Sequence, residues 1–99
     1  MASTNVRLKL IAEPYNDSEQ RLFEMIPLAP RRIDSKSLTK KYFNGVRKER
    51  RPRFEQNTVI AILNSLQWKV EQNNESFRVV KSEPRGPHPI DVWVERSRN

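Results

Sequence analysis

The N-terminal third of the chain changes from strand-like to helix-like spacing of its hydrophobic residues. Residues 6–11 alternate between apolar and basic side chains, which predicts a half-buried strand. Asp17 or Ser18 is expected to cap a short helix that Pro27 ends, because proline cannot continue a helix. The core face of this helix is predicted to consist of Leu22, Phe23 and Ile26.

A second short helix is predicted over residues 36–43, after a very short strand at Ile33. Asp34 or Ser35 is expected to cap this helix. Gly45 is expected to close it, because glycine readily adopts the left-handed conformation that ends helices. The core side chains of the second helix are predicted to be Leu38, Tyr42 and Phe43.

The longest helical signal covers residues 54–72. Apolar residues recur there at spacings of three and four: Val59, Ile62 or Leu63, Leu66 and Val70. The face between them carries Asn57, Thr58, Ala61, Asn64, Ser65 and Trp68. Strands are then predicted over residues 77–81 and 90–95. The proline-rich connection between them cannot be sheet, so it is expected to form a stiff hairpin tip that carries Arg85 and His88.

The order of the predicted elements is strand, helix, short strand, helix, basic loop, long helix and hairpin. Residues 31–38 lead from the short strand into a capped helix, and residues 77–95 form the hairpin. From Ser18 onward this order resembles a winged helix-turn-helix domain, and it is similar to the effector domains of response regulators. The resemblance implies an α+β fold with three helices, a C-terminal β-hairpin wing and an N-terminal strand. The loop before the long helix is more basic than that family requires. We expect no receiver domain, so the resemblance does not imply control by phosphorylation.

Length and composition fit a single domain with one modest core. The chain has 99 residues, of which 35% are hydrophobic. We therefore expect one domain over residues 1–99, with an N-terminal strand and extension at 1–16 and the helix-turn-helix core and wing at 17–96. The sequence has no cysteine, which excludes a disulfide scaffold and a thiolate metal site. No apolar run approaches the roughly 18–20 residues that span a bilayer, so we expect a cytoplasmic, nucleoid-associated protein without membrane contact.

The net charge of +7 is concentrated in one segment of the chain. Residues 31–53 contain ten basic and two acidic residues, whereas the rest of the chain is nearly neutral. A localised positive field attracts polyanions and supplies the sequence-independent part of nucleic-acid affinity. The alternative is a solvated basic loop that contacts nothing. The side chains expected to neutralise phosphates are Lys40, Lys41, Arg47, Lys48, Arg50, Arg51 and Arg53.

The polar face of the long helix is expected to approach the edges of bases. Its side chains are small or carry amides, and asparagine can form two hydrogen bonds with adenine. The resemblance implies that this helix lies in the major groove and that the hairpin tip touches a neighbouring groove or the backbone. The alternatives are a solvated helix face and an exposed turn residue at the tip. The residues assigned to DNA contact are Asn57, Thr58, Ala61, Asn64 and Ser65 on the helix and Arg85 at the tip.

The remaining aromatic and histidine residues add little chemistry. Packing is favoured for Trp93, whereas Trp68 is left open between packing, base stacking and a dimer contact. His88 is the only histidine, and the sequence shows no partner that would make it a metal ligand or a general base. The chain also lacks a glycine-rich phosphate loop and metal-ligand spacing, so we expect no enzyme activity, metal or cofactor.

The sequence therefore predicts a small protein that binds double-stranded DNA sequence-specifically, as a transcriptional regulator or a replication-associated factor. A single module contacts few base pairs, so the hypothesis allows a homodimer that pairs two half-sites. Two alternatives of other classes stay open. One is a basic protein that binds RNA or a ribonucleoprotein, and the other is a winged-helix module whose basic patch docks an acidic protein.

Overall fold

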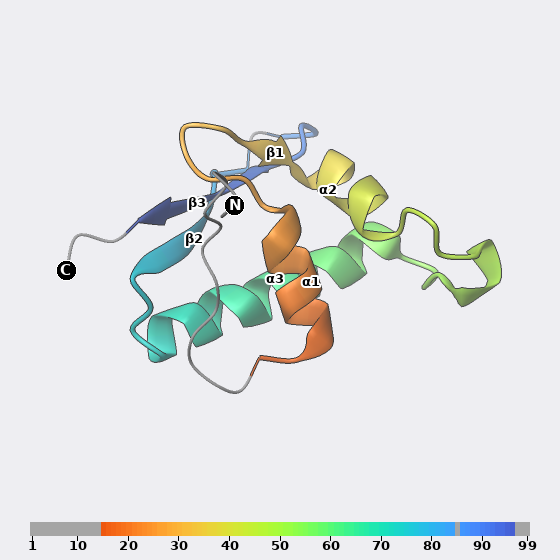
Figure 1. Ribbon diagram of the computed structural model, residues 1–99. Coiled ribbons are helices and arrows are strands. Elements are labelled where there is room, and N and C mark those ends of the chain that lie inside the picture. The colour runs from red at the N-terminus through yellow and green to blue at the C-terminus, as the bar shows by residue number, and fades with distance from the viewer. Residues whose placement is uncertain (1–14, 85, 97–99) are drawn as a thin grey trace, which may run out of the picture.

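The computed structural model describes residues 15–84 and 86–96. Over these ranges the chain has three α-helices and a three-stranded antiparallel sheet, so the predicted α+β class is confirmed (Figure 1). The elements are α1 (Asp17–Met25), β1 (Ile33–Asp34), α2 (Ser35–Tyr42), the short 3-10 helix η1 (Lys48–Arg50), α3 (Glu55–Gln72), β2 (Phe77–Lys81) and β3 (Asp91–Arg96). The strand predicted over residues 6–11 and the tip residue Arg85 lie outside the described residues.

The first helix begins one residue earlier than the sequence predicted. Asn16, rather than Asp17 or Ser18, is the N-cap: its Oδ1 accepts from the Glu19 amide at 2.8 Å, and the Glu19 Oε1 accepts from the Asn16 amide at 2.9 Å. This reciprocal pair satisfies two backbone donors that would otherwise lack helical partners, which explains why the cap lies at Asn16. The helix ends at Met25, and Ile26 is extended, as a residue before proline prefers to be.

The second helix follows the sequence prediction closely. Asp34 caps α2, because its side chain accepts from the Ser37 amide at 2.7 Å and from the Ser37 hydroxyl at 2.9 Å. The backbone hydrogen bond from Ser37 is the main reason that the pKa of Asp34 is lower than usual. Gly45 then adopts a φ of 84°, a conformation that favours glycine and turns the chain away from the helix.

The sheet has the strand order β1-β3-β2, so the hairpin brings β3 between β2 and the short strand β1. Ile33 of β1 lies opposite Val92, and Val79 of β2 lies opposite Val94. The free edge of β2 faces α3, where the Gln67 side-chain amide donates to the Val79 carbonyl at 2.9 Å. This bond occupies one of the backbone acceptors that an edge strand leaves exposed.

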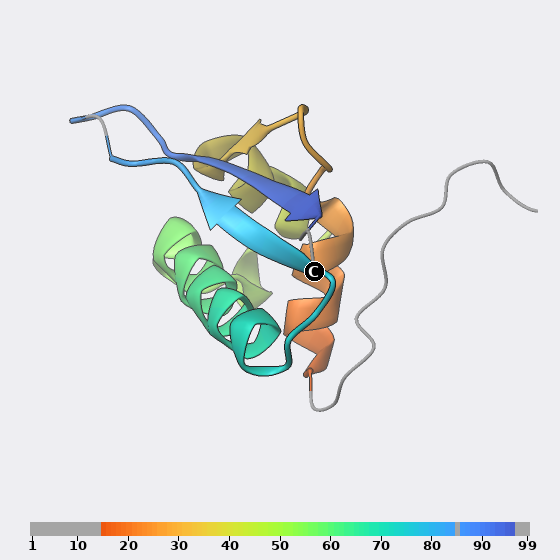
Figure 2. The ribbon, with the colours of Figure 1, turned by 90° about the vertical axis from the view of Figure 1, so that its left-hand side faces the viewer.

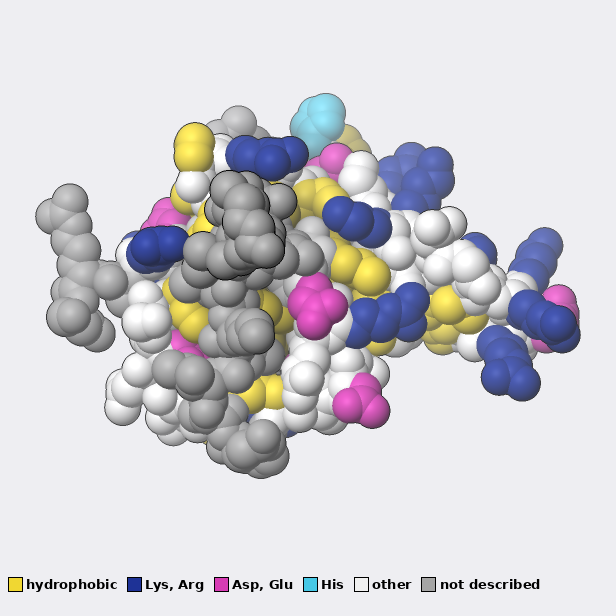
Figure 3. Space-filling view, in the orientation of Figure 1, with side chains coloured by type: hydrophobic (Ala, Val, Ile, Leu, Met, Phe, Trp, Pro, Cys, Tyr) yellow, Lys and Arg dark blue, Asp and Glu magenta, His cyan; other side chains and the backbone are white. Residues whose placement is uncertain are grey.

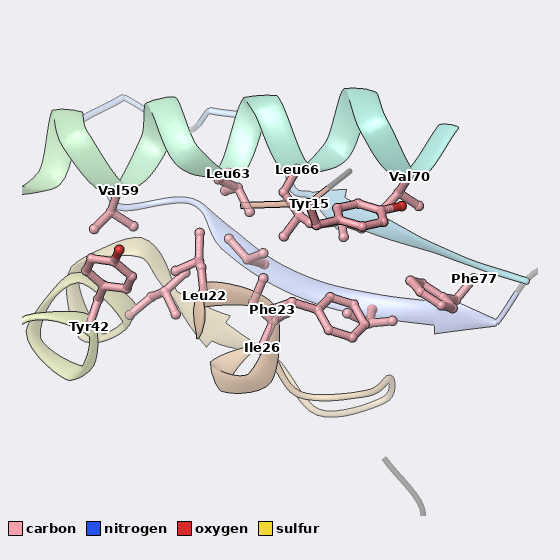
Figure 4. Close-up of a cluster of buried hydrophobic side chains, with 14 of the residues drawn as sticks. Tyr15, Leu22, Phe23, Ile26, Tyr42, Val59, Leu63, Leu66, Val70 and Phe77 are labelled. Atoms are coloured by element: carbon pink, nitrogen blue, oxygen red, sulfur yellow. The ribbon is translucent and has the colours of Figure 1, made fainter. Parts of the chain in front are cut away.

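The core lies between α3 and the other elements (Figure 4). The apolar row predicted on the long helix is buried and consists of Val59, Leu63, Leu66 and Val70. Of the two alternatives at the second position, Leu63 is fully buried and Ile62 is only partly buried. The residues that meet this row from α1, α2 and β2 include Leu22, Phe23, Leu38, Tyr42 and Phe77. The core faces predicted for the three helices are therefore confirmed.

Candidate nucleic-acid interface

The basic loop at residues 46–53 forms a projection at one end of the molecule. The segment leaves α2, turns through η1 and returns to the start of α3 (Figure 1). Lys and Arg side chains gather at this end, at the right of the space-filling view (Figure 3). Glu49 is the one acidic residue in the segment. The exposed basic residues are Arg47, Lys48, Arg50 and Arg53, and all four were predicted to contact phosphates.

Arg51 differs from the other basic residues of the loop, because it braces the loop from inside. Its Nε donates to the Val46 carbonyl at 2.8 Å, and its Nη1 lies 3.7 Å from the Glu55 Oε1. The Arg51 side chain is only 35% exposed. The sequence assigned Arg51 to phosphate contact, but part of its hydrogen-bonding capacity is used within the fold.

A hollow between α2 and the start of α3 adds positive charge beside the loop. Its volume is about 520 Å³, and it is lined by Lys36, Thr39, Lys40, Asn44, Arg51, Glu55 and Gln56. Three of these side chains are cationic and one is anionic, so the hollow favours an anion. Lys41 is also exposed, in the last turn of α2. Lys40 lines the hollow together with Arg51 of the basic loop.

Over residues 57–68 the outward face of α3 is exposed and has no charged side chain of the helix, and the exposed Glu71 follows near the end of the helix. Asn57, Ala61 and Asn64 share this face because they follow at helical spacing, and all three are exposed. Trp68 continues the same face one turn later and is 61% exposed, so it does not pack into the core. The hairpin extends past α3 on the side of the molecule away from α1 (Figure 2). The structure thus brings three of the predicted base-reading residues together.

Two residues of the predicted base-reading set use their hydroxyl groups within the fold. The Ser65 hydroxyl donates to the Glu19 Oε2 at 2.6 Å, so the expectation that Ser65 faces outward is wrong. The Thr58 hydroxyl donates to the Phe54 carbonyl at 3.0 Å, one turn earlier in the chain. Both residues are only partly exposed. One further residue of helix rotation separates Ser65 from Asn64, which explains why neighbours in sequence face different surroundings.

Glu19 of α1 binds two side chains of α3 and so holds the two helices together. Its carboxylate is 1% exposed and accepts from the Lys69 Nζ at 2.8 Å as well as from Ser65. Burial raises the pKa of Glu19, but the hydrogen bonds from Lys69, Ser65 and the Asn16 backbone outweigh it and hold the pKa below its usual value. Glu19 is therefore ionised at neutral pH and joins α1 to α3.

Lys81 is a site residue that the sequence prediction missed. Phe77, Val79 and Lys81 alternate along β2 and point to the same side of the sheet, toward α3. The first two are buried, whereas Lys81 lies where the core ends, and its ammonium donates to the Asn64 Oδ1. The available signal was a lysine at the third inward position of an apolar alternation.

Trp93 lies on the opposite side of the sheet from the core. The Arg32 guanidinium carbon is 4.3 Å from the centroid of the Trp93 ring, and the indole Nε1 donates to the Glu95 Oε2 at 2.8 Å. Arg78 donates to the other oxygen of Glu95, also at 2.8 Å. These hydrogen bonds, that of Trp93 first, lower the pKa of Glu95. Trp93 therefore contacts charged side chains on the outer face of the sheet and does not pack in the core.

The described part of the chain contains no group of three or more His, Asp or Glu residues placed to hold a metal ion. His88 is exposed near the hairpin tip. In the same ranges, no helix combines the length and the apolar character that crossing a membrane requires. No protein-family model, curated protein or solved structure matches this chain. The function is therefore inferred from the geometry of the residues themselves.

Proposed function

We propose that this chain is a winged-helix protein that binds double-stranded DNA sequence-specifically, as a small transcriptional regulator or a replication-associated factor. The observation that carries the proposal is the continuity of two surfaces. An exposed basic loop leads directly into α3, and over residues 57–68 the outward face of α3 is exposed, carries amides and has no charged side chain of the helix. The element order and the β1-β3-β2 sheet are compatible with a winged-helix layout. The proposal allows a homodimer.

In this proposal the basic loop and the end of α2 supply the affinity that is independent of sequence. Each lysine or arginine that neutralises a phosphate releases counterions, so binding weakens as the salt concentration rises. The exposed positions of the loop leave their charged groups available for such contacts. The residues proposed to contact phosphates are Lys40, Lys41, Arg47, Lys48, Arg50 and Arg53.

The outward face of α3 supplies sequence discrimination. A helix fits the major groove, where amide side chains form hydrogen bonds with base edges and a methyl group packs on the thymine methyl. Asn57 and Asn64 carry the amides, and Ala61 between them carries the methyl group. With α3 in the major groove, the hairpin would approach a flanking groove, where Arg85 would make its contact.

The proposal is tested by the salt dependence of binding to duplex DNA in a gel shift, with duplex RNA of the matched sequence as a comparison. Arg50→Gln removes an exposed charge from the loop, so it should weaken binding to every sequence. It should also reduce the slope of log affinity against log salt by about one. Arg78→Gln is the matched control, because this arginine lies on the outer face of the sheet and pairs with Glu95 at 2.8 Å. The control should leave the slope unchanged.

Three results would overturn the proposal. Tighter binding to the duplex RNA would favour the RNA or ribonucleoprotein alternative. Retention of neither nucleic acid would favour a module that docks an acidic protein through the same basic surface. Equal effects of Arg50→Gln and Arg78→Gln would show that only the net charge of the protein matters, and not the loop.

A further inference from the structure

The contact between Lys81 and Asn64 changes which hydrogen-bond donors and acceptors the outward face of α3 presents to a base. Lys81 is the last residue of β2, and the alternation of the strand directs its side chain toward α3. Its ammonium donates to the Asn64 Oδ1 at the border between the core and the outward face. The two side chains therefore form one polar unit made from the sheet and the helix.

We infer that Lys81 and Asn64 together select guanine, and not adenine, at one position of the DNA site. The inference rests on the proposed DNA binding and adds a specificity-determining residue to it. Asparagine recognises adenine by accepting from the adenine N6 with Oδ1 while Nδ2 donates to N7. A carbonyl oxygen can accept two hydrogen bonds, but the adenine amino group would here meet the positive charge of Lys81 at that oxygen.

Guanine presents the complementary pattern. Its major-groove edge carries two acceptors, O6 and N7, and no donor. With Oδ1 bound to Lys81, Asn64 still has its Nδ2 donors, and the Lys81 ammonium has two further protons. The unit is thus a cluster of donors next to a positive charge, which fits two acceptors and repels an amino group.

Asn57 provides the contrast within the same helix. It lies on the same face, two turns before Asn64, and its side chain makes no hydrogen bond within the described part of the chain. Both its oxygen and its nitrogen are available, so Asn57 keeps the ability to bind adenine with two hydrogen bonds. Two asparagines on one helix face are therefore assigned to different bases, because Asn64 bonds Lys81 and Asn57 has no such bond among the residues that the structure describes.

The test is a selection of bound sequences from a random pool of duplex DNA, carried out with the parent protein and four variants. Asn64→Ala identifies the base position that this residue contacts, because the preference at that position is lost. The parent should prefer guanine there by about tenfold over adenine. Lys81→Met keeps the alkyl chain but frees the Asn64 oxygen, so the same position should change to adenine.

Two further variants control for charge and folding. Lys81→Arg keeps a cationic donor and should keep guanine. Lys48→Met removes the same charge from the basic loop, so it should weaken binding while the selected sequence stays the same. The thermal unfolding of all the variants is compared with that of the parent, so that a loss of fold is recognised.

The outcomes separate this inference from the function on which it rests. If the parent enriches no sequence, the proposed function is overturned and the inference with it. If the parent enriches a site but Lys81→Met selects the same base as the parent, only the inference is overturned. An Asn64→Ala variant that selects the same site as the parent would also overturn the inference alone. A change from guanine to adenine in Lys81→Met, and not in Lys48→Met, supports it.

Discussion

The two polar sides of α3 carry similar residue types and serve different purposes. On the outward side, Asn57 and Asn64 are exposed. On the side toward α1, Ser65 and Lys69 both donate to the buried carboxylate of Glu19. The difference comes from the neighbouring element: α1 presents a buried acceptor, and the outward face meets solvent. Ser65 is therefore occupied by a buried partner on α1, whereas Asn57 and Asn64 stay exposed, and the one partner described for Asn64 is Lys81 of β2.

The largest expected effect on stability comes from removing the Glu19 carboxylate, which binds the side of α3 that faces α1. Glu19→Ala deletes the capping interaction with Asn16 and the hydrogen bonds from Ser65 and Lys69. We expect the free energy of unfolding to fall by about 4 kcal/mol, which sums about 1 kcal/mol for the capping interaction and about 1.5 kcal/mol for each of two hydrogen bonds to a charged group. Loss of Glu19 also leaves Lys69 without its ion-pair partner. The Lys69 side chain is 25% exposed and reaches water, so its unpaired charge adds little to the loss of stability. Urea denaturation at neutral pH measures the loss.

Asn57→Ala is the matched control for stability, because it removes a polar side chain of the same helix that faces solvent. Its free energy of unfolding should lie within about 0.5 kcal/mol of the parent value. If Glu19→Ala and Asn57→Ala unfold at the same urea concentration, the contrast between the two sides of α3 is wrong.

The second effect concerns binding at the outward side. In the proposed function, Asn57→Ala should reduce affinity for the selected DNA site by about tenfold, because a pair of hydrogen bonds to one base is lost. Affinity for random duplex DNA should stay at the parent value, since Asn57 is uncharged and contributes nothing to phosphate neutralisation. Fluorescence anisotropy with both duplexes measures the ratio. Parallel losses on the two duplexes would remove Asn57 from base recognition.

Ser65→Ala tests the correction made to the sequence prediction. The substitution leaves a buried carboxylate oxygen without the donor at 2.6 Å, so we expect a loss of stability of about 1.5 kcal/mol. The selected DNA sequence should not change, because the hydroxyl points to α1. A variant that keeps its stability but selects a different sequence would return Ser65 to the base-reading face.

Within the described residues, local patterns in the sequence were sufficient for the three α-helices, the strands and the core. The spacing of Val59, Leu66 and Val70 predicts the buried row of α3, and Asp34 is recognisable as a cap from its position before a helix. Such signals depend on neighbours within a few residues, which is why they can be read without a structure.

The contacts that define the candidate site connect distant positions and could not be read in this way. Glu19 meets Ser65 from another helix, and Lys81 meets Asn64 from a strand. Asn64 and Ser65 differ by one residue of helix rotation, and the sequence does not show which of the two directions α1 covers. The misplaced first cap has a local reason: Asp17, Ser18 and Asn16 are all good caps, and the reciprocal bonds with Glu19 decide among them.

The smallest expected effect is the pH dependence of the free energy of unfolding. This dependence separates the contribution of the Glu19 charge from that of its hydrogen bonds. Because the folded state lowers the pKa of Glu19, the ionised group stabilises the fold above its unfolded value near 4.5. This contribution is lost as the pH falls through the lower folded value. Glu19→Gln keeps the capping geometry but has no proton to gain, so the parent should be the more stable protein at pH 7. The difference in urea midpoint between the two should narrow at pH 4 and below. A difference that stays constant from pH 7 to pH 3 would mean that the Lys69 contact stabilises the fold through packing alone.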